Sequence, residues 1–265
     1  MRFIDIHETR AHALGGRIMR DLGDSVLLHA PHDRDPFFNR VAAVRWPESP
    51  GAFDHRLAEV MALFIGLDRG PHIWTASAFN TPQDLGARLA AHGFRDAGGG
   101  YVMLLVRPAS DEPLRVAAGI TIERLSGGPG VAIRYGAVRE IAGVLAESFG
   151  LEADRLDAIE AETAATFGSR AFHVSIVRLG GEAVAVGKRY TFDGASYLSS
   201  IGTRPSLRGR GFGSLVTEAL VRDSVATGSR HVYLGVRTEN DRAISIYRQA
   251  GFEIVGERTG DFLLV

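Results

Sequence analysis

Apolar and polar residues alternate at 172–177 in the second half of the chain, and two strand-like runs follow at 183–191 and 197–203. Alternation with a period of two is typical of a strand with one buried face, so we expect three strands here. The Asp193-Gly194 dipeptide between the last two stretches favours a two-residue hairpin turn, because both residues tolerate a positive φ. These strands are therefore expected to pair antiparallel.

Helical spacing of apolar residues flanks the three strands. It predicts helices over 136–149 and 155–167, and another that begins at Ser214. The resulting order is strand, two helices, three antiparallel strands, loop, helix, strand, helix and closing strands. It predicts an α/β (α+β) domain with a mixed, mainly antiparallel, twisted sheet flanked by helices. The remaining strands are expected at 120–125, 231–234, 253–256 and 262–265.

The first half of the chain repeats this pattern at an offset of 158 positions, which carries Gly93 onto Gly251. Segment 89–94 resembles segment 247–252, and both end in Gly-Phe. We therefore expect two tandem domains of common architecture. The same offset, without a gap, carries Pro47 onto Pro205, the helical run 57–67 onto 215–225, and the strand 73–76 onto 231–234.

The boundary between the two domains is expected in the polar stretch 107–113, Arg-Pro-Ala-Ser-Asp-Glu-Pro, because two prolines bracket it between apolar runs. We therefore predict one domain over residues 1–112 and a second over residues 116–265.

Composition narrows the class of protein. The 265 residues are 45% hydrophobic and 23% charged with a net charge of −1, which suits a protein with a large core and no basic face for nucleic acid. No cysteine is present, so disulfides, thiolate metal sites and an acyl-cysteine intermediate are excluded. The acidic residues near Met1 argue against a signal peptide, and the longest apolar run, around 60–67, is too short to cross a membrane. We expect a cytoplasmic protein without a membrane partner.

A metal site is not expected. His29, His32 and Asp33 form the most tempting cluster, but they lie in a proline-rich loop without a helix or hairpin to hold them.

The glycine-rich segment 208–213, Arg-Gly-Arg-Gly-Phe-Gly, lies between a predicted strand and a predicted helix. Glycines let a backbone approach a ligand closely, and a helix N-terminus favours an anion, so a diphosphate suits this loop. A Walker A loop is excluded because it needs a lysine, and a dinucleotide fingerprint because Ser214 occupies its third glycine position.

Arg208, Gly211 and Gly213 fit the pattern Arg/Gln-x-x-Gly-x-Gly/Ala, which resembles the acetyl-CoA loop of GNAT superfamily N-acetyltransferases. Asn240, Ala243 and Tyr247, followed by a Gly-Phe pair, resemble the other signature helix of that superfamily at a typical distance. The tandem arrangement is similar in architecture to two-domain acetyltransferases such as mycothiol synthase.

This resemblance implies acetyl-CoA as the co-substrate and a set of site residues. Tyr247 is the candidate that protonates the departing CoA thiolate, although its place on an apolar helical stripe also suits a core residue. Gly202 suggests a bulge, where free amides would face the thioester. The expected cofactor-binding residues are Ile201, Gly202, Thr203, Arg208, Gly209, Arg210, Gly211, Phe212, Gly213, Ser214 and Asn240.

The general base is left open. Glu160, Glu162 and His173 lie in elements that border the acceptor cleft in the family, but so do many inert residues, and we expect a structural role for each of the three. Relay through bound water from a backbone carbonyl is a further alternative.

The first half has lost this loop, if the offset holds. Arg208, Gly211 and Gly213 fall onto Pro50, Phe53 and His55, and Tyr247 falls onto Leu89. Proline removes an N–H donor and phenylalanine blocks a close approach, so this half is expected to be a degenerate GNAT-like domain that does not bind the cofactor.

The sequence therefore predicts an acetyl-CoA-dependent N-acetyltransferase that acts by direct transfer in a ternary complex. The acceptor is expected to be a primary amine on a small molecule, and a protein amino group is also credible. The alternatives are a transferase of another acyl group and a non-catalytic acyl-CoA-binding protein. Whether the chain forms a homodimer stays open.

Overall fold

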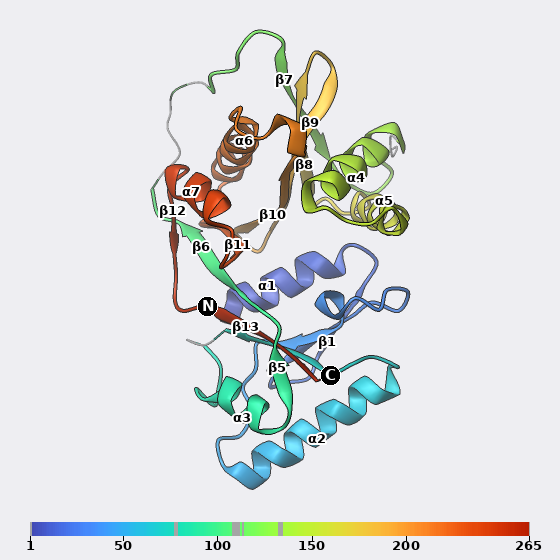
Figure 1. The fold of residues 1–265 in the computed structure, drawn as a ribbon, viewed down its shortest axis with the longest axis vertical. Coiled ribbons are helices and arrows are strands. Elements are labelled where there is room, and N and C mark those ends of the chain that lie inside the picture. The colour runs from blue at the N-terminus through green and yellow to red at the C-terminus, as the bar shows by residue number, and fades with distance from the viewer. Residues whose placement is uncertain (1, 77–78, 108–111, 113, 132–134, 265) are drawn as a thin grey trace. The chain divides into compact units, whose positions relative to one another are not determined.

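The computed structural model describes residues 2–76, 79–107, 112, 114–131 and 135–264, which form two compact units (Figure 1). Unit 1 comprises Met1–Val102, Arg237–Glu239 and Val255–Val265, and unit 2 comprises Met103–Val236 and Asn240–Ile254. This division differs from the predicted domains 1–112 and 116–265, because each unit contains chain from both halves. Residues 108–111 and 113 of the predicted linker fall outside the described residues.

Unit 1 is built on a six-stranded sheet with the order β1-β2-β3-β4-β13-β5. Its core is formed by aromatic and aliphatic side chains of the sheet, of α2 and of the segment between β3 and α2, including Leu27, Trp46, Phe53 and Phe64. The pairs are antiparallel except for the parallel pair β3–β4. Its elements are α1 (Arg2–Ala13), β1 (Ile18–Asp21), β2 (Val26–His29), η1 (Pro36–Phe38), β3 (Arg40–Ala42), α2 (Pro50–Gly66), β4 (His72–Ala76), α3 (Leu85–Ala91), β5 (Phe94–Asp96) and β13 (Thr259–Leu264).

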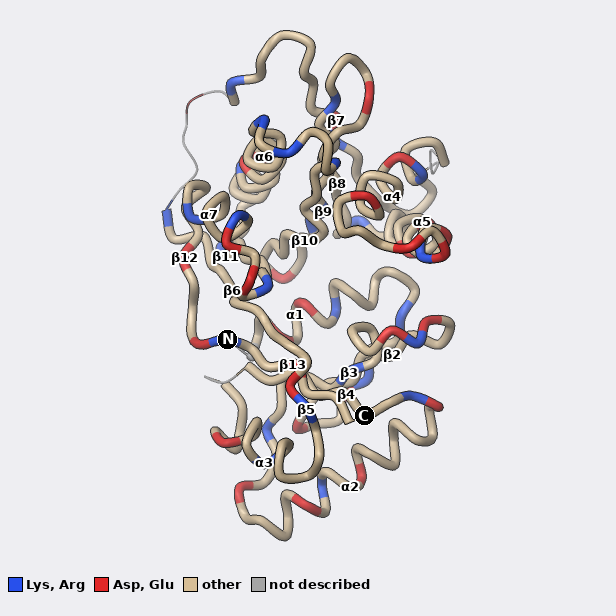
Figure 2. Tube along the Cα trace, in the orientation of Figure 1, with Lys and Arg blue, Asp and Glu red and all other residues tan. Residues whose placement is uncertain are grey.

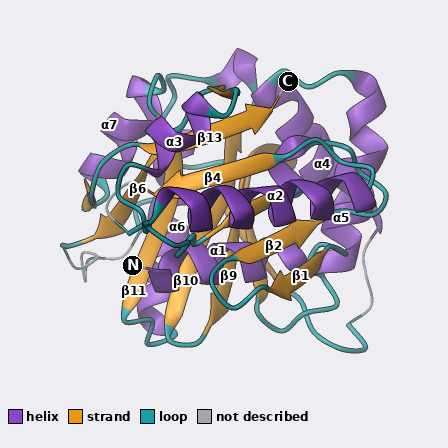
Figure 3. Ribbon diagram, turned by 90° about the horizontal axis from the view of Figure 1, so that it is seen from below, coloured by secondary structure: helices purple, strands orange, loops and turns teal. Residues whose placement is uncertain are grey.

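Unit 2 is built on a seven-stranded sheet with the order β12-β6-β11-β10-β9-β8-β7, of which β9, β10 and β11 are seen beside one another in Figure 3. Helices α4 and α6 pack against its strands. Its elements are β6 (Gly100–Leu105), β7 (Ile120–Ser126), α4 (Tyr135–Phe149), η2 (Ala153–Arg155), α5 (Leu156–Thr166), β8 (Phe172–Leu179), β9 (Glu182–Phe192), β10 (Ala195–Thr203), η3 (Pro205–Leu207), α6 (Phe212–Ala226), β11 (His231–Arg237), α7 (Asp241–Gln249) and β12 (Phe252–Ile254).

The predicted hairpin and the predicted fold class are both confirmed. Asp193 and Gly194 have φ values of 50° and 76°, and Phe192 pairs with Ala195 across the turn. The two units are mixed sheets flanked by helices, and the offset of 158 carries β5 onto β12 residue for residue. The predicted helix from Ser214 begins two residues earlier, at Phe212. Basic and acidic positions are interspersed along the helices, as in α2 and α4 (Figure 2).

Each sheet contains a strand from the other half of the sequence. Strand β13, at the end of the chain, lies between β4 and β5 in unit 1, whereas β6 lies between β12 and β11 in unit 2. The offset of 158 places β6 and β13 at equivalent positions of the repeat. The two halves have therefore exchanged corresponding strands.

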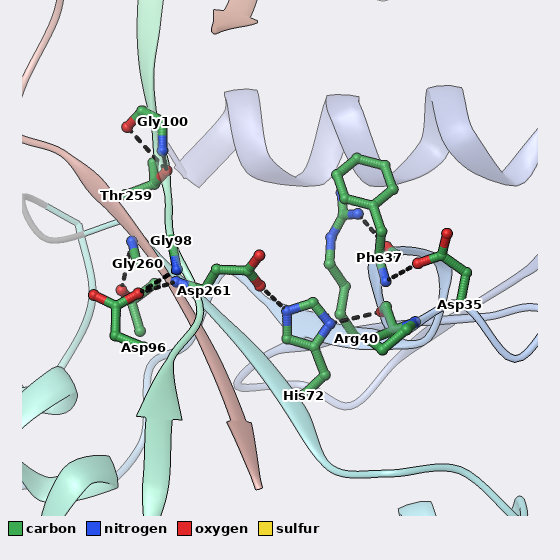
Figure 4. Close-up of polar contacts among 12 residues, drawn as sticks. Asp35, Phe37, Arg40, His72, Asp96, Gly98, Gly100, Thr259, Gly260 and Asp261 are labelled. Atoms are coloured by element: carbon green, nitrogen blue, oxygen red, sulfur yellow. Dashed lines mark hydrogen bonds and ion pairs between the residues drawn. The ribbon is translucent and has the colours of Figure 1, made fainter. Parts of the chain in front are cut away.

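Polar contacts hold β13 in the sheet of unit 1 (Figure 4). Thr259 Oγ1 donates to the carbonyl oxygen of Gly100 at 3.1 Å and accepts from the Gly100 N–H at 3.0 Å. Asp96 accepts hydrogen bonds from the backbone N–H of Asp261 and of Gly98. The ring of buried His72 bridges the Asp261 carboxylate and the Pro36 carbonyl oxygen.

The backbone at Gly99 lies in close contact with the backbone of Thr259 in β13. A Cβ atom on Gly99 would lie 1.9 Å from the carbonyl oxygen of Thr259, which is backbone and cannot rotate away. Gly99→Ala should therefore reduce the free energy of unfolding by about 1–3 kcal/mol and lower Tm by several degrees in thermal denaturation.

Gly51→Ala is the matched control, because a Cβ atom there meets nothing within 4 Å and the residue lies in a helix. It should leave Tm unchanged or raise it slightly. Equal Tm values for the two variants would contradict the close approach.

Candidate active site

A cavity of about 610 Å³ opens in unit 2 where four elements meet. These are the C-terminal end of α4, the end of β10, the loop that leads into α6, and α7. The cavity brings together every predicted site residue except Arg210. Its lining residues are Ser148, Phe149, Ile201, Gly202, Thr203, Leu207, Arg208, Gly209, Gly211, Phe212, Gly213, Ser214, Thr217, Asn240, Arg242, Ala243, Ser245, Ile246 and Tyr247.

Strand β10 separates from its neighbour beside this cavity. Its parallel pairing with β11 covers Ala195–Leu198, although β10 continues to Thr203 and every residue of both strands is described. Its antiparallel pairing with β9 shifts register between Ser199 and Gly202, and Ser200 has a φ of 50°. The bulge predicted at Gly202 is therefore present. The edge of β10 that faces away from β9 is left available beyond Leu198.

Gly202 also sets the distance between β10 and α4. A Cβ atom on Gly202 would lie 2.8 Å from Cβ and Oγ of Ser148, so any larger residue would push the helix end away. This close approach explains why Ser148 and Phe149 line the cavity.

The glycine-rich loop adopts a backbone that requires glycine. Gly209 and Gly211 have φ values of 84° and 83°, in the left-handed region, and Gly211 directly precedes α6. A Cβ atom on Gly211 would meet nothing within 4 Å, so its Cα faces open space. The first N–H groups of α6 have no carbonyl partner within the helix, and the helix dipole adds a positive field there. The loop is therefore suited to an anion.

The three arginines near the loop have different environments. Arg208 lines the cavity and donates through Nη2 to the carbonyl oxygen of Ser148 at 2.6 Å. Arg242, which is not among the predicted site residues, also lines the cavity. Arg210 does not line it, and its guanidinium lies over the ring of Phe212, 5.4 Å from the centroid. The predicted cofactor contact of Arg210 is therefore not supported by its position.

Helix α7 supplies the remaining polar groups. The Asn240 side chain caps this helix, since its Oδ1 accepts a hydrogen bond from the Ala243 N–H at 3.1 Å. Tyr247 lines the cavity but is only 7% exposed, and its ring packs edge-on against Phe252 at 6.3 Å. Burial raises the pKa of the Tyr247 hydroxyl to about 12. Tyr247 is therefore protonated at neutral pH.

The three candidate bases lie elsewhere. Glu160 forms an ion pair with Arg139 at 3.5 Å, and Glu162 with buried Lys188 at 3.6 Å. His173 lines a separate cavity, and burial together with the positive charge of Arg189 lowers its pKa to about 4. The residues that line the main cavity, all of them described, include no aspartate, glutamate or histidine.

In unit 1, two residues at the equivalent positions belong to the core, whereas Pro50 and His55 are exposed on α2. Pro50 is the first residue of α2, Phe53 is 1% exposed and packs 5.8 Å from Trp46, and Leu89 is fully buried. His29 contacts the Asn39 side chain at 3.0 Å. Among the described residues, no group of three or more histidine, aspartate or glutamate side chains is arranged for a metal, and no helix is long and apolar enough to span a membrane.

Residues 139–252 match the acetyltransferase (GNAT) family, and this segment contains every predicted site residue. The N-alpha-acetyltransferase RimI of Mycobacterium tuberculosis is 44% identical over 59 residues, which are 22% of this chain and 35% of RimI. An uncharacterized protein of Mycobacterium leprae is 42% identical over 59 residues, or 22% of this chain and 16% of that protein. The chain thus matches about a third or less of the length of these curated relatives.

Two solved structures resemble the whole chain. A GCN5-related N-acetyltransferase from Kribbella flavida has a TM-score of 0.67 and 21% identity, over 97% of this chain and 93% of that one. A tandem GNAT protein from the clavulanic acid biosynthesis pathway has a TM-score of 0.64 and 16% identity, over 96% and 86%. The fold is thus that of tandem GNAT proteins, and the match to the acetyltransferase (GNAT) family lies in the second half of the chain.

The lowered pKa of His173 leads to a testable pH dependence. Because the folded protein favours neutral His173, the unfolded chain binds more protons between pH 6.5 and about 4, so stability should fall as the pH falls through that range. In NMR, the ring proton of His173 should titrate with a midpoint near 4. His173→Gln should weaken the pH dependence of unfolding in the same range. A midpoint near 6.5 would show that the ring is not shielded.

Proposed function

We propose that unit 2 binds acetyl-CoA in the main cavity and transfers its acetyl group to a primary amine. The main support for this proposal is that one cavity is lined by the glycine loop, the start of α6 and the unpaired edge of β10. A diphosphate suits the helix start, and an extended pantetheine arm suits a free strand edge. The family match of residues 139–252 supports the same activity.

In the proposed reaction, the amine nitrogen attacks the carbonyl carbon of the thioester. The carbon–sulfur bond then breaks, the nitrogen loses a proton, and the CoA thiolate gains one. Free backbone N–H groups near Ile201, Gly202 and Thr203 would stabilise the negative charge on the carbonyl oxygen, and such a donor contributes about 3 kcal/mol in a site without water. No cysteine is present to carry the acyl group, so transfer is direct.

Tyr247 is proposed to act on the departing thiolate. A free thiol has a pKa of about 8.5. The pKa of Tyr247 is about 12. Complete proton transfer from the hydroxyl to the thiolate would therefore cost about 5 kcal/mol. We infer that Tyr247 donates a strong hydrogen bond to the sulfur while the bond breaks, and that water completes the protonation.

Deprotonation of the amine requires a group other than a carboxylate or histidine of the cavity wall. A water molecule held by a backbone carbonyl fits this requirement, because positioning of the two reactants supplies much of the rate. RimI is named as an N-alpha-acetyltransferase, which supports a primary amine as the acceptor class. We propose a small-molecule amine as the acceptor.

Calorimetric titration of the purified chain with acetyl-CoA tests the proposal, with CoA, 3′-dephospho-CoA, succinyl-CoA and NAD as comparators. We expect one site per chain with micromolar affinity and no binding of NAD. Two sites would show that unit 1 also binds the cofactor. Tighter binding of succinyl-CoA would favour a different acyl donor. The absence of binding to every CoA compound would overturn the proposal.

Gly211→Trp should abolish this binding. The new ring would occupy the open space in front of the helix start, and we expect a loss of affinity of at least about 100-fold, or about 2.7 kcal/mol. Gly228→Trp is the matched control, because Gly228 also has a positive φ and open surroundings but lies at the other end of α6. Unchanged affinity in Gly211→Trp would contradict the assignment of the loop.

Tyr247→Phe should slow turnover by about 10- to 100-fold, the loss expected for a hydrogen bond to a charged group. The affinity for acetyl-CoA should change little. Release of the CoA thiol, followed with a thiol reagent, measures the rate. Tyr190→Phe is the control, because Tyr190 is a buried tyrosine of the same unit, in β9, that does not line the cavity. Equal rates in wild type and Tyr247→Phe would assign Tyr247 to the core alone.

A further inference from the structure

We propose that a second cavity of unit 2 binds a small monocarboxylate through the buried guanidinium of Arg189. This cavity has a volume of about 330 Å³ and shares no lining residue with the main cavity. Strands β7, β8 and β9 and the C-terminal end of α6 form its walls. The main cavity lies at the N-terminal end of the same helix, which has 15 residues, so the two sites are about 20 Å apart along it.

Arg189 uses only part of its hydrogen-bonding capacity. Its Nη1 donates to the carbonyl oxygen of Asp223 at 3.1 Å and to the hydroxyls of Thr191 and Thr227 at 3.1 and 3.0 Å. Among the described residues, its Nε is shielded from water without a hydrogen-bond partner, and its Nη2 makes no hydrogen bond. The side chain is only 4% exposed, so a buried cation lacks part of its compensation.

The unused donors are adjacent. Nε and Nη2 form one edge of the planar guanidinium, and two parallel N–H groups on one edge match the two oxygens of a carboxylate. The Nη1 bonds hold the plane of Arg189 against the end of α6, so Nη2 is already oriented, whereas a ligand oxygen reaches the shielded Nε after a small shift of its neighbours. A planar, two-oxygen anion is therefore the ligand class that best satisfies the group.

The charge of the cavity wall favours a single negative charge. Arg124 Nε bonds both carboxylate oxygens of Asp223, at 2.8 and 3.0 Å, so these two charges compensate each other. His173 is neutral at pH 7, and its Nδ1 lies 3.0 Å from Ser126 Oγ. The positive charge of Arg189 is therefore available to attract an anionic ligand. A doubly charged anion such as phosphate carries one more negative charge than Arg189 can compensate. The excess charge would lie near the Asp223 carboxylate and be repelled by it.

Neutral groups of the wall can contribute further bonds. Ser175, Thr227 and His173 line the cavity. The hydroxyl of Thr227 already donates to the Ser224 carbonyl oxygen, so toward a ligand it serves as an acceptor. These groups would accept or donate hydrogen bonds to the body of the ligand beyond its carboxylate.

Titration with sodium acetate, followed by NMR of the His173 ring proton, tests the proposal. The full chain is used, and sodium chloride keeps the ionic strength constant at roughly 0.1 M, because surface effects of salt are thereby held equal. We expect a saturable shift with a half-saturation in the millimolar range, about what a ligand of four non-hydrogen atoms allows. Bound acetate should also raise the midpoint of the His173 titration above about 4, because a nearby anion favours the imidazolium form.

Two substitutions on α6 form a matched pair. Ala226 is exposed and lines the cavity, so Ala226→Trp should fill its mouth and abolish the saturable shift. Val225 is exposed but does not line it, so Val225→Trp should bind acetate as the wild type does. Both variants should keep their affinity for acetyl-CoA, which shows that the fold is intact. Arg189→Gln should remove acetate binding and lower Tm, since the Nη1 bonds to α6 are also lost.

Three results would overturn the proposal. They are the absence of saturation in the wild type, equal binding by Ala226→Trp and Val225→Trp, and binding of methylammonium or inorganic phosphate as tight as that of acetate. None of these depends on acetyl transfer, so failure here is distinguishable from failure of the proposed function.

Discussion

The exchange of β6 and β13 is the constraint on which both units depend. Each of these strands lies in the interior of a sheet, between β4 and β5 or between β12 and β11. Buried backbone N–H and C=O groups must be paired, so removal of either strand would leave two unpaired edges inside a sheet. Neither unit is therefore a continuous segment of the sequence. Contacts such as that between His72 and Asp261 close the longest loops of the chain, and such contacts are expected to form late in folding.

The main cavity depends on a local interruption of the same kind of pairing. Strand β10 leaves β11 after Leu198, and the bulge at Ser199–Gly202 redirects its edge toward the glycine loop. Two glycines with positive φ then turn the chain into α6, and Gly202 admits the end of α4. The site is thus assembled from backbone geometry, and this explains why a cavity with few charged side chains is suited to an anionic, extended ligand.

The two halves fill corresponding positions of one architecture with different kinds of residue. In α2, Phe53 fills the core of unit 1 at the position equivalent to Gly211, and Leu89 is buried at the position equivalent to Tyr247. Each of these two side chains buries apolar surface, which contributes about 1.5–3 kcal/mol. Unit 2 retains the glycines and tolerates the strain of positive φ at Ser200, a cost that is common at functional sites.

Local sequence patterns were sufficient to predict the helices, the strands and the position of the glycine-rich loop. Period-two alternation, helical spacing and the Asp193-Gly194 turn depend on neighbours in the chain, so the strands, the helices and the repeat could be predicted from them. The glycine positions likewise identified the wall of the cavity in advance.

Which distant segments complete a sheet or a site depends on tertiary packing and is seen only in the structure. The offset equates β6 with β13, but a pattern repeated in both halves cannot show which strand joins which sheet, because both have the same local character. Ser148 lines the cavity because the absence of a side chain at Gly202 lets the end of α4 approach β10. The guanidinium of Arg210 lies over the ring of Phe212, and Arg210 does not line the cavity. His173 and Arg189 come together from separate strands in the same way. Such contacts depend on packing between segments far apart in sequence, which local periodicity does not encode.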